Sequence, residues 1–478
     1  MKWILVFAFL LFSIPTFAQN SVSVQSGIDP RLLRQDLDLL YQQLQLNHPK
    51  LFESRSKADA DEQLKQISSS ITKPMNRLAF HRLIAPFVSG FKDGHIFIDV
   101  DFDGEDISQY TQSGGTFFPL EVVIINNRLY CKGNPFAKGA LQRGDEILTI
   151  NREPVRQLLP RLRGLMSADG EETANASLQR LFGYMLWLDG LQGTATSVQY
   201  RRGKETLQDE LGGISKEDLL KLVFPAGGLQ RQLHLYPESS LAVVEINSYA
   251  QLAKSKAFID SCFQLIKSKG IRNVALDLRK NGGGNSAIGD YFLAHVTSRP
   301  YSTISRKSWR IGPLLQQLDS THWMRKAVAS VERSYSKEDD FLHSPVFEAQ
   351  PVVAISDPSL FSPVRLFLFT SARTYSSAHM TALAVKCGGL GTIIGQPTGE
   401  RLDLTGEILE YILPHSKLTL VIPVASYKAA CGRGSDVGVQ PDFLVTQRPD
   451  DLLEGRDPEL AFLTDLLKKN KQEGAIHR

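Results

Sequence analysis

Cysteine is scarce in this sequence, with four residues in a chain of 478. Four thiols are too few to hold a chain of this length together, so a disulfide scaffold is excluded. They also lack the close pairs that structural zinc sites use. Their positions are Cys131, Cys262, Cys387 and Cys431. One disulfide is still possible, with Cys387 and Cys431 as a candidate pair, although buried free thiols are the simpler expectation.

Long apolar runs and an excess of one charge are also missing. Beyond the N-terminal segment, no stretch is long and apolar enough to span a bilayer. The net charge is +3, and basic clusters are limited to short runs, so nucleic-acid binding is not indicated. A hydrophobic content of 42% and a charged content of 22% are ordinary for a globular protein. The length predicts two to four domains.

The first eighteen residues have the pattern of a secretory signal peptide. Lys2 supplies the positive start, Trp3 to Phe12 the apolar centre, and Thr16 to Ala18 a small-residue cleavage site. The apolar stretch is too short for a comfortable membrane span, and no cysteine follows the cleavage site to carry a lipid. An uncleaved anchor is the alternative, and the cleavage site argues against it. We therefore expect cleavage after Ala18 and a mature chain that is periplasmic or secreted.

A nucleotide-binding glycine loop has little support. The chain has no Gly-Lys-Ser/Thr phosphate loop, and a G-x-G-x-x-A match at Gly282, Gly284 and Ala287 lacks an acidic residue ending a following strand. A strand, a helix and a strand are expected at 241–246, 257–267 and 273–278, which predicts a parallel pair. The glycines then lie at the carboxyl end of a strand, the edge that catalysis favours. Their N–H groups could stabilise a developing oxyanion.

A serine stands where a buried strand turns into a helix. The apolar run 366–369 predicts the strand, the stretch 378–387 predicts the helix, and Gly388 ends it. Ser376 lies between them, beside helix amides that have no intrahelical partner. Those amides could stabilise an oxyanion next to a nucleophilic serine. The alternative is that Ser376 only caps the helix, as serines commonly do.

A histidine stands at a second junction, at the end of a helical region over 30–91. Asp93 and Gly94 form a strong turn signal, and a strand is expected over 96–100. His95 lies between turn and strand, where it could act as a general base, although a structural role is the alternative. A metal held by Asp93 and His95 lacks a third ligand. His379, one helical turn after the serine, is a second candidate base.

The run from residue 114 to 155 resembles a PDZ domain. Its A-x-x-x-L-x-x-G-D-E-I-L-x-I-N pattern, from Ala137 to Asn151, predicts a helix, a turn and a strand. The resemblance implies that the preceding segment offers backbone N–H groups to a peptide carboxylate, and that peptides add to a sheet edge. That segment comprises Phe117, Phe118, Pro119 and Leu120. Helical sequence over 156–190 interrupts the module, whose last strand is expected at 198–201, and a PDZ fold without a ligand is the alternative.

The chain as a whole is similar to the tail-specific, or C-terminal-processing, serine peptidases. Besides the PDZ-like segment, the resemblance rests on four motifs in the expected order over most of the mature chain. They are L-D-L-R-K-N-G-G-G-N at 276–285, T-Y-S-S-A at 374–378, G-Q-P-T-G at 395–399 and G-V-Q-P-D at 438–442. Each motif is modest alone, but their order and spacing together are specific.

Two catalytic plans occur in this family. One uses a lysine base after the G-x-P-T segment, where this chain has Arg401, and arginine does not deprotonate in proteins. The other plan, in tricorn-like members, uses a histidine that precedes the PDZ segment, and His95 stands there. The resemblance therefore implies that Ser376 is the nucleophile and that His95 is its general base.

The same matching implies an oxyanion hole built from the backbone amides of Ser377 and of Gly283 or Gly284. Tricorn-like members also carry a serine before the histidine, where this chain has Gly94, and a glutamate near the G-V-x-P-D segment. The nearest acid to that segment here is Asp436, to which we assign the orientation of the base.

Together these features predict a multi-domain α/β protein with a catalytic core of the crotonase-like, tail-specific protease type. The expected units are a signal peptide at 1–18, a helical domain at 19–105, a PDZ-like domain at 106–212 and a catalytic domain at 213–478. We expect an exported serine endopeptidase that cleaves peptides or unfolded proteins through an acyl-enzyme, without a metal or organic cofactor. The alternative is an inactive relative that binds peptides or apolar ligands.

Overall fold

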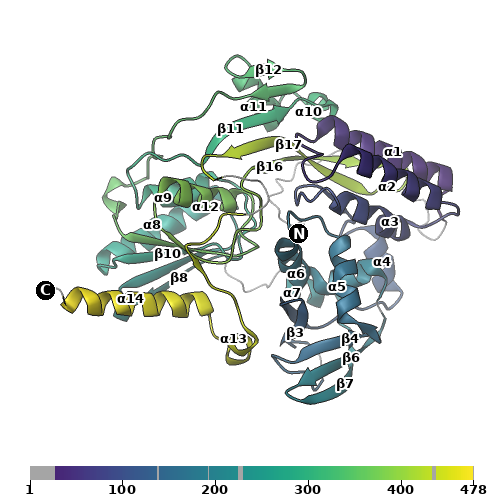
Figure 1. Cartoon of the computed structure of the whole chain (residues 1–478), viewed down its shortest axis with the longest axis horizontal. Coiled ribbons are helices and arrows are strands. Elements are labelled where there is room, and N and C mark those ends of the chain that lie inside the picture. Colours follow the sequence, from purple (N-terminus) through teal and green to yellow (C-terminus); the bar gives the residue numbers. More distant parts are fainter. Residues whose placement is uncertain (1–26, 137–138, 192, 224–229, 433–437, 477–478) are drawn as a thin grey trace.

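The computed structural model describes residues 27–136, 139–191, 193–223, 230–432 and 438–476 (Figure 1). The predicted signal peptide, residues 1–18, and Asp436 lie outside these ranges. Helices and strands mix throughout the chain, as in other proteins of the predicted class, and the predicted α/β multi-domain fold is confirmed. Among the described residues, no helix is long and apolar enough to cross a membrane.

The N-terminal region consists of helices, as the leucine spacing predicts. They are α1 (Pro30–Asn47), α2 (Lys57–Ser70) and α3 (Arg77–Ser89). Each begins at a polar residue whose side chain accepts a hydrogen bond from a first-turn amide. The leucines of α1 at positions 33, 37, 40 and 44 are fully buried. The polypeptide then turns at Asp93 and enters the short strand β1 (Phe97–Asp99).

A five-strand path forms the sheet of the PDZ-like region, in the order β2-β3-β4-β6-β7. Its members are β2 (Glu121–Ile125), β3 (Arg128–Gly133), β4 (Glu146–Ile150), β6 (Ala195–Arg202) and β7 (Glu205–Gly212), and β5 (Glu153–Pro154) pairs with β4. The helices α5 (Val155–Gly164) and α6 (Glu171–Asp189) lie between β5 and β6. Two expectations were wrong: the described residues 139–145 form no helix, and the strand at 198–201 is followed by β7.

A largely parallel sheet forms the centre of the C-terminal half, in the order β18-β15-β14-β10-β9-β8. The strands are β8 (Arg231–Tyr236), β9 (Leu241–Ile246), β10 (Asn273–Asp277), β14 (Arg365–Thr370), β15 (Thr392–Gly395) and β18 (Phe443–Leu444). Only β8 runs antiparallel to its neighbour. The predicted strand–helix–strand unit is confirmed as β9, α8 (Leu252–Ser268) and β10, with β9 and β10 parallel.

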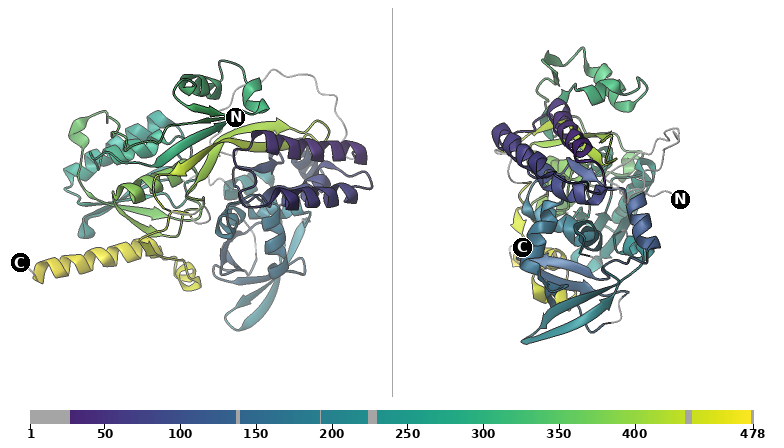
Figure 2. Two further views of the ribbon diagram at one scale, coloured as in Figure 1. Left: turned by 45° about the horizontal axis from the view of Figure 1, so that its top comes forward. Right: turned by 90° about the vertical axis from the view of Figure 1, so that its right-hand side faces the viewer.

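Helices cover both faces of this sheet (Figure 1). The strand residues alternate, so that Leu366 and Leu368 face α8, α9 (Ala287–Ala294) and α12 (Ser377–Gly388), whereas Phe367 and Phe369 face α14 (Pro458–Ile476). The long helix α14 extends along the sheet and away from the rest of the molecule (Figure 2). A sheet buried on both faces explains the apolar runs that the sequence shows for its strands.

An antiparallel sheet joins this core to the N-terminal helices. Its path is β1-β17-β11-β13-β12, with β16 also paired to β17. The strands are β11 (Ile304–Arg310), β12 (Ser336–Glu338), β13 (Phe341–His343), β16 (Leu404–Ile412) and β17 (Thr419–Ala429). Asp36 of α1 accepts the amide hydrogens of His415 and Ser416 in the β16–β17 turn, which fixes the hairpin against the helices.

A disulfide between Cys387 and Cys431 connects the end of α12 to the segment after β17. The candidate pair of the sequence is therefore the bonded one, and Cys131 and Cys262 are buried free thiols. The remaining described elements are short helices and turns. They are α4 (Glu105–Gln112), α7 (Lys216–Val223), α10 (Pro313–Gln317), α11 (Trp323–Val331), α13 (Pro449–Glu454), and the 3₁₀ turns η1 (Pro237–Ser239) and η2 (Pro358–Leu360).

Candidate active site

Ser376 lies at the sharp turn between β14 and α12. Its backbone has φ 51° and ψ −126°, a left-handed conformation that costs a serine free energy. Its side chain makes no capping hydrogen bond to the helix, although it occupies the N-cap position. Within the described ranges, no hydrogen bond engages its Oγ atom, and the residue is partly exposed. The strain and the unused hydroxyl favour a reactive serine over a helix cap.

Two glycines of the loop after β10 lie against this serine. Gly283 has φ +106°, and a Cβ atom added there would lie 2.7 Å from the Cβ of Ser376. Gly284 has φ +132°, and its added Cβ would lie 2.4 Å from the carbonyl oxygen of Tyr249. Neither position can hold a side chain, so this loop approaches the nucleophile through glycine alone.

The amides of this loop are not equivalent. The Gly283 N–H donates to Asn281 Oδ1 at 2.8 Å and is therefore already engaged. The Gly284 N–H has no partner among the described residues, and its carbonyl accepts the Ser377 hydroxyl at 2.6 Å. Ser377 begins α12, so its own N–H also lacks an intrahelical acceptor. Of the predicted oxyanion donors, Ser377 and Gly284 fit the geometry, whereas Gly283 serves the loop.

His95 is buried beside Tyr375, with a ring-to-ring distance of 5.0 Å. Asp93 Oδ1 accepts the His95 backbone N–H at 2.8 Å, which fixes the turn that presents the ring. The Nδ1 atom faces polar atoms, 3.3 Å from Glu400 Oε1 and 3.4 Å from Thr405 Oγ1. No hydrogen bond engages the Nε2 atom within the part of the chain that the structure describes. Burial lowers the pKa of His95, so its imidazole is neutral at neutral pH and can accept a proton.

Glu400 joins the serine to the histidine, and sequence reasoning missed it. The Ser376 N–H donates to Glu400 Oε2 at 2.6 Å, while Oε1 of the same carboxyl faces His95 Nδ1. Burial, and then the nearby charge of Asp169, raises the pKa of Glu400 well above its usual range. The Oε1 and Nδ1 atoms lie 3.3 Å apart, and Oε1 has no hydrogen-bond partner among the described residues. Its signal was present in the sequence, since Glu400 directly follows the G-Q-P-T-G motif.

A second acid, Asp93, also lies beside His95, with its Oδ1 atom 3.9 Å from Nδ1. Its Oδ2 lies 3.0 Å from His48 Nε2 and accepts the Thr405 hydroxyl at 2.8 Å. Burial alone would raise the pKa of Asp93, but the His48 hydrogen bond and the two neighbouring histidines hold it well below its usual range. An ionised carboxylate so close to His95 stabilises the positive charge that the ring gains on accepting a proton.

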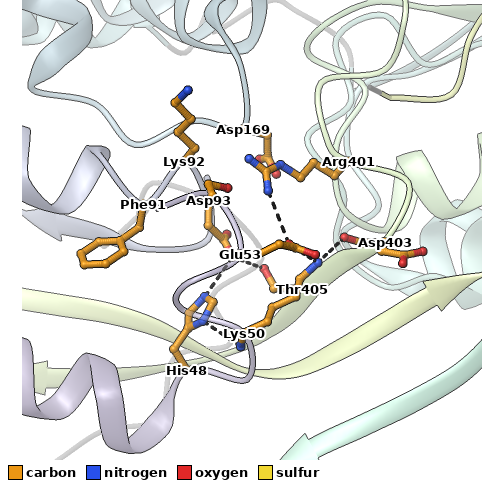
Figure 3. A pocket seen from close by; sticks show the side chains of 11 residues that line it. His48, Lys50, Glu53, Phe91, Lys92, Asp93, Asp169, Arg401, Asp403 and Thr405 are labelled. Carbon is orange, nitrogen blue, oxygen red and sulfur yellow. Dashed lines mark hydrogen bonds and ion pairs between the residues drawn. The ribbon is translucent and has the colours of Figure 1, made fainter. Parts of the chain in front are cut away.

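A small pocket lies beside Asp93, two residues before the predicted base (Figure 3). Eleven residues line it, including Arg401 and Asp169, whose side chains lie close together in the view. The Arg401 guanidinium lies 3.4 Å from Glu53, in an ion pair, so the residue at the expected lysine position has a structural partner. The other lining residues are His48, Lys50, Ser54, Phe91, Lys92, Asp93, Asp403 and Thr405.

Other predicted residues lie elsewhere. His379 is fully buried, its Nδ1 is 2.8 Å from Thr398 Oγ1, and burial lowers its pKa to about 3. The predicted orienting acid, Asp436, lies outside the described residues. The segment from Phe117 to Leu120 is buried.

The predicted carboxylate-binding loop of the PDZ-like region is engaged internally. Phe117 exchanges both backbone hydrogen bonds with Ile214, and the Phe118 ring packs 5.4 Å from Phe182 of α6. In the adjacent strand β2, the Ile124 N–H donates to Gln179 Oε1 at 2.9 Å. The helix α6 therefore occupies the strand edge where a peptide would add.

Comparisons with known proteins relate this chain to peptidases in sequence and in fold. Residues 240–445 match the model of peptidase family S41. A structure of mature CPAF complexed with lactacystin is similar at 15% identity and a TM-score of 0.62, covering 93% of this chain and 98% of that chain. The CPAF s499a mutant is similar at 14% identity and a TM-score of 0.65, covering 89% and 94%. No curated protein matches the chain.

Proposed function

Because residues 240–445 match the model of peptidase family S41, we propose that this chain is an exported serine endopeptidase acting through an acyl-enzyme on Ser376. One observation carries the assignment of the residues. A single carboxyl, that of Glu400, contacts both the amide of the strained Ser376 and the Nδ1 atom of His95. This is the arrangement of a nucleophile, a base and an orienting acid.

In the proposed reaction, His95 Nε2 takes the proton of Ser376 Oγ as this oxygen attacks a peptide carbonyl carbon. The C=O bond becomes a C–O⁻ bond, and the Ser377 and Gly284 amides donate to this oxyanion. Collapse of the intermediate breaks the C–N bond, and the imidazolium returns its proton to the leaving amine. Water, deprotonated by His95 in turn, then hydrolyses the ester and releases Ser376.

The acids would act on the base rather than on the substrate. Glu400 lies beside Nδ1 of His95, and Nε2 is the atom to which we assign the proton transfer with the serine. The negative charge of Asp93 favours the imidazolium form that appears in each proton transfer. In other serine hydrolases a single aspartate both orients the imidazole and stabilises its protonated form. Here two acids from different segments of the chain would share these roles.

Export is part of the proposal. The predicted signal peptide supports a periplasmic or secreted location, and so does the Cys387–Cys431 disulfide, because disulfides persist in oxidising compartments. The substrates would be peptides or unfolded proteins, which enter an active site as extended chains. The PDZ-like region would take part in substrate handling only where the contact between β2 and α6 opens.

The test is hydrolysis of quenched-fluorescent peptides and of an unfolded protein by purified mature chains. The variants are Ser376→Ala and His95→Ala, with Ser371→Ala as a matched control on the same loop. We expect turnover by the wild type and by the control, and losses of about 10³-fold or more in the other two. Turnover that survives Ser376→Ala would refute the proposal. Absence of turnover in a folded wild type that binds peptides would favour the inactive ligand-binding relative.

A further inference from the structure

The loop between α5 and α6 reaches from the PDZ-like region into the active site. Its last residues, Asp169 and Gly170, precede the first turn of α6. Asp169 lines the pocket beside Asp93 and lies near Arg401 in the close view (Figure 3). The sequence pattern indicates only a helical interruption for this stretch, and the proposed mechanism does not use it.

One oxygen of Asp169 accepts hydrogen bonds from the neighbours of both reacting residues. The Gly94 N–H donates to Asp169 Oδ2 at 3.1 Å, and the Tyr375 hydroxyl donates to the same oxygen. Gly94 directly precedes His95, and Tyr375 directly precedes Ser376. This one carboxyl therefore bridges the loop that carries the base and the loop that carries the nucleophile.

A second contact from the same segment reaches the acid. The Thr173 hydroxyl, in the first turn of α6, donates to the carbonyl of Gly399 at 2.6 Å. Gly399 directly precedes Glu400. The five residues from 169 to 173 thus contact the neighbours of the nucleophile, the base and the acid.

The contact at Asp169 is too close for the loops to shift independently. A Cβ atom added at Gly94 would lie 2.5 Å from the Tyr375 hydroxyl oxygen and 3.2 Å from Asp169 Oδ2. The Tyr375 ring in turn packs against the His95 ring. A change in the position of Asp169 would therefore move the base relative to the serine, and displacements of about 1 Å can cost catalysis roughly 10²-fold.

We propose that Asp169 is a positioning residue that aligns His95 with Ser376. The inference rests on the proposed function, because it assigns Asp169 to the geometry of that same site. It makes the α5–α6 loop a physical connection between the loop that carries the base and the loop that carries the nucleophile.

The charges around Asp169 predict how this connection depends on pH. Its carboxyl interacts with two acids, one cation and one hydroxyl group, which are Asp93, Glu400, Arg401 and the Tyr375 hydroxyl. Burial, and then the charge of Asp93, raises the pKa of Asp169 to about 7. Above that pH the carboxyl is ionised and accepts stronger hydrogen bonds than its neutral form. Alignment, and with it activity, should therefore rise as the pH increases through 7.

The experiment measures the rate of Ser376 labelling by a fluorophosphonate probe between pH 5 and 9. The variants are Asp169→Ala, which removes the acceptor, Asp169→Asn, which keeps an acceptor without the charge, and Tyr375→Phe, which removes one donor. The control is Asp189→Asn, at the other end of α6, where the carboxyl pairs with Arg161 outside the site. Thermal unfolding of each variant reports whether it folds.

We expect Asp169→Ala to lower the labelling rate about 10- to 100-fold and Tyr375→Phe to lower it about 3- to 10-fold. We expect Asp169→Asn to remove the rise near pH 7, a change that a merely structural role would not produce. Asp189→Asn should keep both the rate and the pH profile.

Labelling of Asp169→Ala within threefold of the wild type, with an unchanged profile in Asp169→Asn, would overturn the inference while leaving the proposed function intact. An unlabelled wild type would instead contradict the proposed function itself. If Asp169→Ala does not fold, Tyr375→Phe decides, because unchanged labelling in that variant contradicts the alignment role.

Discussion

The two sheets of the C-terminal half contribute different parts of the active site. The parallel sheet supplies Ser376 from the end of β14 and the glycine loop from the end of β10, both within one local arrangement. The antiparallel sheet supplies His95 before β1 and Thr405 on β16, segments separated by 310 residues in the chain. The nucleophile half is thus a local product of strand–turn–helix geometry, whereas the base half exists only when distant segments pair.

Besides Asp169, a carboxyl and a disulfide connect these halves. Glu400 contacts the amide of Ser376 and the ring of His95, and the Cys387–Cys431 disulfide joins the nucleophile helix to the segment after β17. The first connection carries the chemistry and the second carries stability. Loss of the Glu400 contacts should therefore stop catalysis in a folded protein, whereas loss of the disulfide should lower the stability of the fold.

The largest expected effect is that of breaking the Glu400 connection. Glu400→Gln keeps the size of the side chain but replaces one carboxyl oxygen, beside the Ser376 amide or His95 Nδ1, by an NH₂ group that cannot accept a hydrogen bond, and we expect kcat to fall about 10²- to 10³-fold. The measurement is peptide turnover, with thermal unfolding as a check of folding. Glu410→Gln, on the exposed part of β16, is the matched control. A loss of less than threefold in Glu400→Gln would show that the two sheets are not coupled through this carboxyl.

The next effect concerns the covalent connection. The disulfide closes a loop of 44 residues, and the double variant Cys387→Ser/Cys431→Ser should lose about 2 to 4 kcal/mol of unfolding free energy. Urea unfolding with and without a reductant measures this loss. The wild type should lose the same amount on reduction, and the double variant should not respond to the reductant. Equal stability of all four samples would contradict the account.

A third prediction separates the two histidines near the serine. Burial lowers the pKa of His379 in the folded protein to about 3, whereas its ordinary pKa is 6.5. Between these two pH values His379 is therefore protonated in the unfolded chain and neutral in the folded chain. Stability from this group is therefore present above pH 6.5 and is lost as the pH falls toward 3. We expect His379→Gln to remove about 2 kcal/mol of the destabilisation between pH 7 and 5.

The activity of His379→Gln provides the contrast with His95. Its labelling rate should stay within about tenfold of the wild type, since its Nδ1 faces Thr398 and not the serine. A loss as large as that of His95→Ala would make His379 the base and reverse the assignment of the antiparallel half.

The smallest effect lies in the PDZ-like region. Gln179→Ala removes the acceptor of the Ile124 N–H and should cost about 0.5 to 1.5 kcal/mol of unfolding free energy, with peptide turnover changed less than threefold. Urea unfolding measures the first value. An unchanged stability would mean that water replaces the side chain and that the edge of β2 is already accessible to peptides.

The sequence predicted the parallel half well because its signals are local. The apolar runs of β9, β10 and β14 and the helix α12 lie within a residue or two of the predicted positions. A parallel sheet buried on both faces produces continuous apolar strands that stand out from their neighbours. The glycine loop was also predictable, because only glycine permits its backbone conformation so close to the serine.

The antiparallel half was harder to predict. The stretches 410–413 and 418–422 predict a hairpin across His415, but β16 and β17 extend beyond these bounds. Glu407, whose φ is 56°, is not paired in the β16–β17 ladder, although the register is the same on both sides of it. Glu400 was missed because its role depends on the position of His95, 305 residues earlier, and motif matching directed attention to Arg401 and Asp436. The domain boundaries stay predictions.

The most direct test of the account is to label the mature protein with a fluorophosphonate probe and to locate the adduct by mass spectrometry. We expect a single adduct on Ser376 in the wild type and none in Ser376→Ala. In folded His95→Ala the labelling rate should fall about 10³-fold. An adduct on another serine, or undiminished labelling of Ser376 in His95→Ala, would contradict the claim that the two sheets join a serine and its base.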